Sequence, residues 1–71
     1  MDDYEFLLYC ETHAGSERCG FTPSQIARLC KLAGLYAAEE RWSKVPNTVV
    51  NCNREEIQEI VNLARIYGNV K

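Results

Sequence analysis

The residues of this sequence best suited to chemistry are its single histidine and its four cysteines. Cys10 and His13 lie three positions apart, a spacing that places both side chains on one face of a helix. A thiol beside an imidazole is the pairing used for nucleophilic catalysis. With Cys19, Cys30 or Cys52 to complete a tetrahedral set, the same pair would be typical of a zinc site.

The spacing of the thiols argues against both uses. No Cys-x2-Cys pair occurs, and successive cysteines are nine, eleven and twenty-two residues apart. Cys10 also falls on the apolar face of its segment, where a thiol packs as a small hydrophobic group. Zinc binding and disulfides in any of three pairings stay open as alternatives for the four thiols. We expect buried free thiols, with no metal and no cofactor.

The other sequence marks of an active site are absent as well. The acidic residues cluster at predicted helix starts, where the helix dipole favours them, and no pair of carboxylates falls on a buried face. The four glycines are scattered singly and make no phosphate-binding loop. We therefore expect that this protein is not an enzyme.

Length and composition predict one domain spanning residues 1–71. The 71 residues are 46% hydrophobic and 25% charged, which is typical of a globular chain. A chain this short buries only about 60% of its unfolded surface, so a partner or a second copy is expected to add stability. Its apolar runs are far shorter than the roughly 18 residues that cross a bilayer. With Asp2 and Asp3 at the start, we expect a cytoplasmic protein without a membrane partner.

The net charge of −2 hides a pattern along the chain. Residues 1–17 carry −5, residues 18–54 carry +4 and residues 55–71 carry −1. A basic centre between acidic ends indicates an electrostatic face. The isoelectric point of about 5.3 lies far below the value of about 9 that is usual for a nucleic-acid-binding domain.

Two of the predicted helices have clear capping signals at their starts. The first runs from Asp2 or Asp3 to about Ala14, where Gly15 suits a left-handed C-terminal cap. The second begins with Thr22 as N-cap, Pro23 at its first position and Gln25 as the capping-box partner. The apolar positions of the first helix are Phe6, Leu7, Cys10 and Ala14. Those of the second are Ile26, Leu29, Cys30, Ala33, Tyr36 and Ala37.

The second helix is expected to run unbroken through Gly34 toward Trp42, because its apolar spacing continues and Pro46 is the first residue that forbids extension. Glycine costs about 1 kcal/mol relative to alanine inside a helix, so the alternative is that Gly34 ends one helix and starts another. Residues 42–53 then form an extended loop, whose β-branched cluster ending at Val50 would need a neighbouring strand, with pairing to a second chain as a minor alternative. Asn53 caps a third helix with Glu56 as its partner, and Gly68 ends it. Its inner face is Ile57, Ile60, Val61, Ala64 and Tyr67. The fold predicted is all-α, a small three-helix bundle with an extended loop between helices two and three.

A continuous second helix would carry a mixed apolar and basic stripe on its outer face: Arg28, Lys31, Leu35, Ala38 and Trp42. Tryptophan and arginine are enriched at binding hot spots, and an apolar anchor rimmed by cations suits an acidic protein surface. We therefore expect a small non-enzymatic interaction module, a regulator or inhibitor in the manner of adaptors, antitoxins or phage inhibitors. Its partner-binding residues are Arg28, Lys31, Leu35 and Trp42. The alternative is that Trp42 folds back over the following loop.

A second function class also has support in the sequence. Residues 24–42 resemble a helix-turn-helix, with Gly34 at the turn and Cys30 in the small-residue slot, which implies a nucleic-acid-binding transcriptional regulator. Glu39 and Glu40 depart from this motif because they would face the phosphates. Nucleic acid is therefore the less favoured partner. A homodimer is a further expectation, from apolar residues outside the predicted core: Tyr4, Leu8, Tyr9, Leu35 and Ile66.

Overall fold

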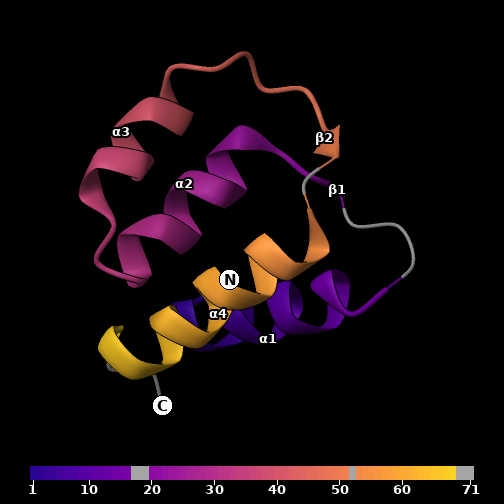
Figure 1. Cartoon of the computed structure of the whole chain (residues 1–71), viewed down its shortest axis with the longest axis vertical. Helices are drawn as coiled ribbons and strands as arrows, with labels where there is room; N and C mark the ends of the chain where they lie inside the picture. Colours follow the sequence, from indigo (N-terminus) through magenta and orange to yellow (C-terminus); the bar gives the residue numbers. More distant parts are fainter. Residues whose placement is uncertain (17–19, 52, 69–71) are drawn as a thin grey trace.

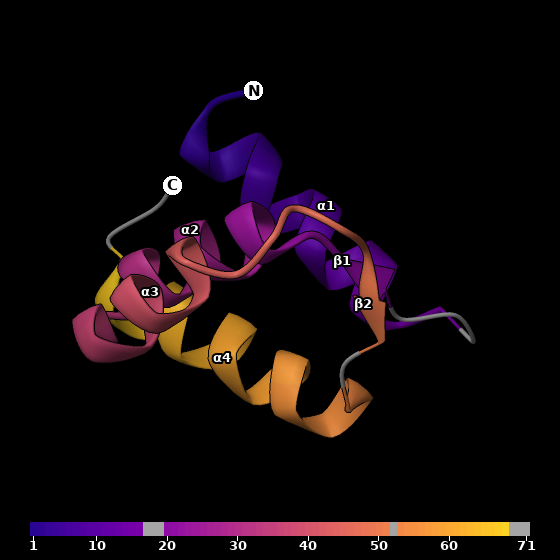
Figure 2. The same cartoon turned by 90° about the horizontal axis from the view of Figure 1, so that it is seen from above.

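A computed structural model describes residues 1–16, 20–51 and 53–68 of the chain. These residues form a mostly helical fold, so the all-α prediction is confirmed, but they contain four helices rather than three and a short two-stranded sheet (Figures 1 and 2). The elements in chain order are α1 (Asp3–Ala14), β1 (Gly20–Phe21), α2 (Pro23–Leu32), α3 (Tyr36–Ser43), β2 (Val50–Asn51) and α4 (Arg54–Tyr67).

The predicted helix starts are confirmed. Asp2 Oδ1 accepts the backbone N–H of Glu5 at 2.8 Å and opens α1. Thr22 and Gln25 form both bonds of the capping box at the start of α2, which satisfies two backbone donors that a helix start would leave unpaired. Asn53 caps α4 by accepting from the backbone N–H of Glu55 at 2.8 Å, one residue earlier than the expected Glu56.

The cap at the end of α1 differs from the prediction. Gly15 has φ −77°, which is ordinary right-handed backbone, and its N–H donates to the carbonyl of Glu11 at 3.1 Å. The prediction of a left-handed residue here was wrong. The chain continues the helical geometry for one more bond, and so this position does not need a glycine's conformational freedom.

The prediction of an unbroken second helix was also wrong, because the chain turns at Gly34. Gly34 has φ +77°, its N–H donates to Lys31 O at 3.0 Å, and the N–H of Leu35 donates to Cys30 O at 2.8 Å. These two bonds and the left-handed residue make a Schellman motif, which satisfies the last carbonyls of α2 and directs the chain away from the helix axis. The predicted second helix is therefore two helices, α2 and α3.

The core lies where α1, α2 and α4 meet. The described residues buried in its main cluster are Phe6, Leu7, Cys10, Ala14, Phe21, Ile26, Leu29, Cys30, Ala33, Ile57, Val61 and Ala64. Most were predicted from helical spacing. Tyr36, Ala37 and Tyr67 were predicted to be inside and are exposed. Tyr36 and Ala37 moved because the turn at Gly34 rotates α3 out of the apolar stripe of α2.

The segment between α3 and α4 is not simply an extended loop. Val50–Asn51 pairs antiparallel with Gly20–Phe21 of the same chain, with Phe21 opposite Val50 and Gly20 opposite Asn51. The β-branched cluster thus finds its neighbouring strand within the chain. This pairing returns the end of the segment to the start of α2, so the residues after α3 lie beside the N-terminal turn of α2 (Figure 1).

None of the described helices has the length and apolar character that a membrane span needs.

Candidate partner-binding groove

A groove lies between the outer side of α2 and α3, and we call it the α2–α3 groove. It has a volume of about 460 Å³. Both helices and the segment that follows α3 contribute to its walls. The lining residues are Ser24, Ala27, Arg28, Lys31, Glu39, Trp42, Ser43, Val45 and Asn47. Arg28, Lys31 and Trp42, three of the four predicted partner-binding residues, therefore line one cavity despite the break at Gly34.

The fourth predicted residue, Leu35, is not part of this groove. It lies in the turn as the N-cap of α3, only 36% exposed. The expectation of one stripe along a continuous helix was wrong, because Arg28 and Lys31 lie on α2 whereas Leu35 and Trp42 lie at the N-cap and near the end of α3. The structure replaces this stripe with a groove whose apolar wall comes from Trp42 and Val45.

The two cations of the groove differ in their electrostatic surroundings. Arg28 Nη2 donates to Asp3 Oδ1 and to the carbonyl of Met1, each at 3.0 Å, and its guanidinium lies 4.5 Å from the ring centroid of Phe6. Lys31 is exposed, and within the described part of the chain its ammonium has no hydrogen bond or ion pair. Lys31 is therefore the cation whose charge is available to a ligand.

Trp42 is half-buried and packs against the core cluster from α3. The guanidinium of Arg41 lies 5.7 Å from its ring centroid, so a cation covers part of the indole. Val45 and Asn47 of the segment after α3 line the same cavity as Trp42. The remaining exposed part of Trp42 forms an apolar patch beside Lys31.

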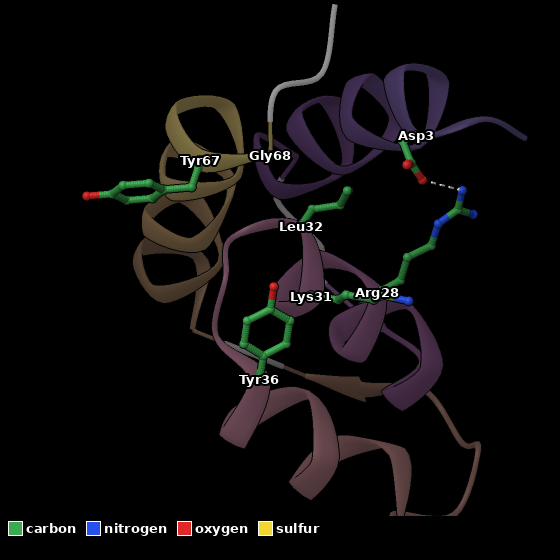
Figure 3. Close-up of a pocket in the computed structure, with 7 residues that line it drawn as sticks. All are labelled: Asp3, Arg28, Lys31, Leu32, Tyr36, Tyr67 and Gly68. Atoms are coloured by element: carbon green, nitrogen blue, oxygen red, sulfur yellow. Dashed lines mark hydrogen bonds and ion pairs between the residues drawn. The ribbon is translucent and has the colours of Figure 1, made fainter.

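A second hollow of about 340 Å³ adjoins the first at the C-terminal end of α2. Arg28 and Lys31 line both hollows, and Tyr36 and Tyr67 belong to the second. In Figure 3, Tyr36 points from the start of α3 toward the end of α2, whereas Tyr67 points away from the other side chains. The same view shows Arg28 reaching to Asp3. Lys31 therefore lines both hollows.

The two walls of the groove are antiparallel helices. Figure 1 shows α3 running back beside α2 in the opposite direction. Leu32 at the end of α2 shares a hollow with Tyr36 at the start of α3, and Ser24 in the first turn of α2 donates to Asn47 Oδ1 beyond the end of α3 at 3.2 Å. The helices of a DNA-binding helix-turn-helix cross at about 90–120° instead.

The described thiols are buried in the core, and the histidine contacts a backbone carbonyl and an aromatic ring. Cys10 and Cys30 are buried and unbonded, and burial raises the pKa of the Cys10 thiol to about 12 and also raises the pKa of Cys30. His13 Nε2 lies 2.6 Å from the carbonyl of Gly20 and its ring stacks on Tyr9. Within the described ranges no cluster of metal-binding side chains occurs; Cys19 and Cys52 lie outside those ranges.

The exposed apolar residues considered for self-association occupy different places. Tyr4 and Leu8, four positions apart on α1, line one hollow together with Arg65 of α4. Arg65 in turn forms an ion pair with Glu11. Tyr9 instead lies against His13, and Leu35 lies in the turn at the end of α2. Of this set, Tyr4 and Leu8 line one hollow together.

Several groove residues were not found from the sequence. Ala27 and Val45 supply apolar lining, Glu39 adds an acid, and Ser24 and Asn47 close one end. Ser24 and Ala27 carried a usable signal, because they share a helix face with Arg28 and Lys31. Glu39, Val45 and Asn47 enter the groove only because α3 folds back along α2.

Comparison with known proteins finds no match to this chain among protein families, curated proteins or solved structures. Its function must therefore be inferred from its own residues.

Proposed function

We propose that this protein is a small non-enzymatic binding module that holds an acidic segment of a partner protein in the α2–α3 groove, and so regulates or inhibits that partner. The observation that carries the proposal is the convergence of Arg28, Lys31 and Trp42 on one cavity. A half-buried indole beside an unpaired ammonium offers apolar contact area and a counter-charge together.

Each of the three residues has its own role in this proposal. Trp42 is the apolar anchor, since it is held against the core and exposes one part of its ring. Lys31 pairs with the partner's carboxylate, because no carboxylate of the described chain neutralises it. Arg28 lines the groove and connects α2 to α1, because its guanidinium forms an ion pair with Asp3.

The experiment is affinity capture from a native lysate with the unmodified chain and three variants. Lys31→Glu and Trp42→Ala are expected to lose the captured protein, while Lys44→Glu retains it. Lys44 is the matched control because it undergoes the same charge change outside the groove, where it pairs only with the exposed Glu40. Circular dichroism confirms that each variant is folded. Equal capture by the unmodified chain and Lys31→Glu contradicts the proposal.

A helix-turn-helix nucleic-acid regulator is the second candidate function. One observation favours it: α2 and α3 are separated by a left-handed glycine at the position where that motif turns. The antiparallel course of α3 and the presence of Glu39 and Glu40 on it weigh against the candidate. Fluorescence anisotropy with labelled duplex DNA separates the two. Affinity that falls steeply with salt and is lost in Arg41→Glu but retained in Trp42→Ala would favour DNA.

Self-association stays a separate prediction. Tyr4 and Leu8 are the two exposed large apolar side chains that line the hollow at the edge of α1. A stable interface usually buries about 800 Å² on each partner, which is more than two side chains supply. Light scattering at high concentration measures the mass directly. A mass of 8.1 kDa would contradict the homodimer, and Leu8→Asp should dissociate any dimer that uses this edge.

A further inference from the structure

The shape of the α2–α3 groove limits the conformation of the segment that can occupy it. We propose that the occupant is a short amphipathic helix with acidic residues on its polar side, which lies along α2 as a third helix. The inference rests on the proposed function, and it adds the conformation and the residue pattern of the partner segment.

The backbone of the groove supports a helical occupant. Its lining residues belong to α2, to α3 and to the segment before β2, and none belongs to either strand. Helices use their interior N–H and C=O groups within themselves. An extended segment would therefore meet no row of backbone partners here and would leave its own polar groups unpaired. A helix satisfies its own backbone and presents only side chains to the walls.

The α2 side of the groove includes small side chains against which a helix can pack closely. Ser24, Ala27, Arg28 and Lys31 recur at spacings of three, one and three residues, which is one continuous face of α2. Ala27 lies on this face and is only 7% exposed, and Ser24 is also small. Small side chains allow two helix axes to approach closely. Arg28 and Lys31 are the larger side chains of this face, and Trp42 of α3 lines the opposite side of the groove.

The positions of Trp42 and Lys31 set the residue pattern of the occupant. Lys31 lies four residues beyond Ala27, which is about 6 Å along α2 at a rise of 1.5 Å per residue. An occupying helix that places an apolar side chain over Ala27 and Trp42 reaches Lys31 about one turn away. Its acidic residue is then three or four positions from its apolar anchor. Glu39 on the opposite wall disfavours a second acid at the anchor itself.

The test uses two synthetic peptides of about 15 residues with the same composition of leucine, glutamate and alanine. One has leucines at helical spacing with glutamates three or four positions away, and the other alternates leucine and glutamate. Trp42 is the only tryptophan of the chain, so its emission reports on the groove. We expect the helical-pattern peptide to shift this emission to the blue and to bind at least about tenfold tighter than the alternating peptide.

The variants connect that difference to the groove. Lys31→Glu should weaken the helical-pattern peptide by about tenfold, and Lys44→Glu should leave its affinity within about threefold. Trp42→Phe keeps an aromatic ring for packing but removes the tryptophan emission. The affinity of this variant is therefore measured by the fluorescence anisotropy of labelled peptides. Equal weakening by Lys31→Glu and Lys44→Glu would show attraction to net charge alone and would overturn the inference.

The outcomes separate this inference from the proposed function. If the alternating peptide binds as tightly as the helical-pattern peptide and Lys31→Glu weakens both, the acidic-segment function stands and the helical occupant is wrong. If neither peptide changes the emission of Trp42 at millimolar concentration, both are contradicted. Tighter binding of duplex DNA than of either peptide, with displacement of the helical-pattern peptide, would also overturn both and favour the nucleic-acid function.

Discussion

Asp3 and Arg28 join the first turn of α1 to the outer face of α2, with Asp3 Oδ1 and Arg28 Nη2 3.0 Å apart. Arg28 also donates to the carbonyl of Met1 and lies over the ring of Phe6. The N-terminal segment thus contacts Arg28, which lines the groove. This contact explains why Arg28 and Lys31, predicted as equivalent cations, have different surroundings.

Asp3→Asn is expected to destabilise the fold only slightly. Both partners of this ion pair are well exposed, so solvent and salt screen it, and exposed pairs contribute about 0–1 kcal/mol. Urea unfolding at low and high salt measures the loss, which should shrink as salt rises. A loss well above 1 kcal/mol that does not respond to salt would contradict this view of the pair.

Gly34→Ala is expected to destabilise the protein by about 1–2 kcal/mol, because φ is +77° there and a side chain rarely adopts that conformation. An added Cβ would meet no heavy atom within 4 Å, so the cost is conformational rather than steric. Gly34→Asn should cost less, since asparagine tolerates left-handed backbone. Chemical denaturation measures the three free energies of unfolding.

The matched control for Gly34 is Gly15→Ala, because Gly15 has φ −77°. Its added Cβ would meet the carbonyl of Glu11 at 3.4 Å, which is close to ordinary contact. The change in free energy of unfolding should stay within about 0.5 kcal/mol. Stabilisation by Gly34→Ala would instead indicate a continuous second helix, in which alanine is preferred to glycine by about 1 kcal/mol.

Ile57→Ala is expected to cost about 2–5 kcal/mol because Ile57 is 1% exposed in the core and its truncation leaves a cavity. Ile66 on the same helix is 69% exposed, so Ile66→Ala should change stability by less than about 0.5 kcal/mol. Thermal unfolding followed by circular dichroism compares the two. Ile57→Val, which costs about 0.5–1.5 kcal/mol, gives a measurable transition if the alanine variant does not fold. Equal losses for Ile57→Ala and Ile66→Ala would contradict the assigned core.

Stability is expected to fall as the pH rises above about 9, because burial raises the pKa of Cys10 from 9.0 to about 12. Above pH 9 the folded chain keeps this proton while the unfolded chain releases it. The stabilisation by the protonated thiol is therefore complete below pH 9 and is lost progressively as the pH rises toward the folded pKa of about 12. The slope is about 1.4 kcal/mol per pH unit. The urea midpoint between about pH 8 and pH 10 measures the effect. Cys10→Ala should reduce the slope without removing it, because burial also raises the pKa of Cys30. An unchanged slope would contradict the assignment.

The local signals in the sequence predicted most of the helix boundaries. Thr22, Pro23 and Gln25 act within one turn, so the start of α2 depends little on the rest of the fold. Helical spacing likewise placed Phe6, Cys10, Leu29 and Ile57 in the core, because burial of one helix face follows from the period of the side chains. The basic character of Arg28 and Lys31 was also visible without coordinates.

Other features depended on contacts between distant parts of the chain. Val50 is partnered by Phe21, twenty-nine positions away, which no local pattern indicates. Gly34 was compatible both with a helix interior, where glycine costs about 1 kcal/mol relative to alanine, and with a Schellman turn, where glycine is favoured. Packing of α3 against α2 decided between them. The sequence by itself therefore determined the helix starts, most of the core and two of the cations, because these follow from short-range hydrogen bonding and side-chain periodicity. Only the tertiary structure decided that Trp42 lines the same groove as Lys31, because that placement depends on the direction in which the chain leaves the turn.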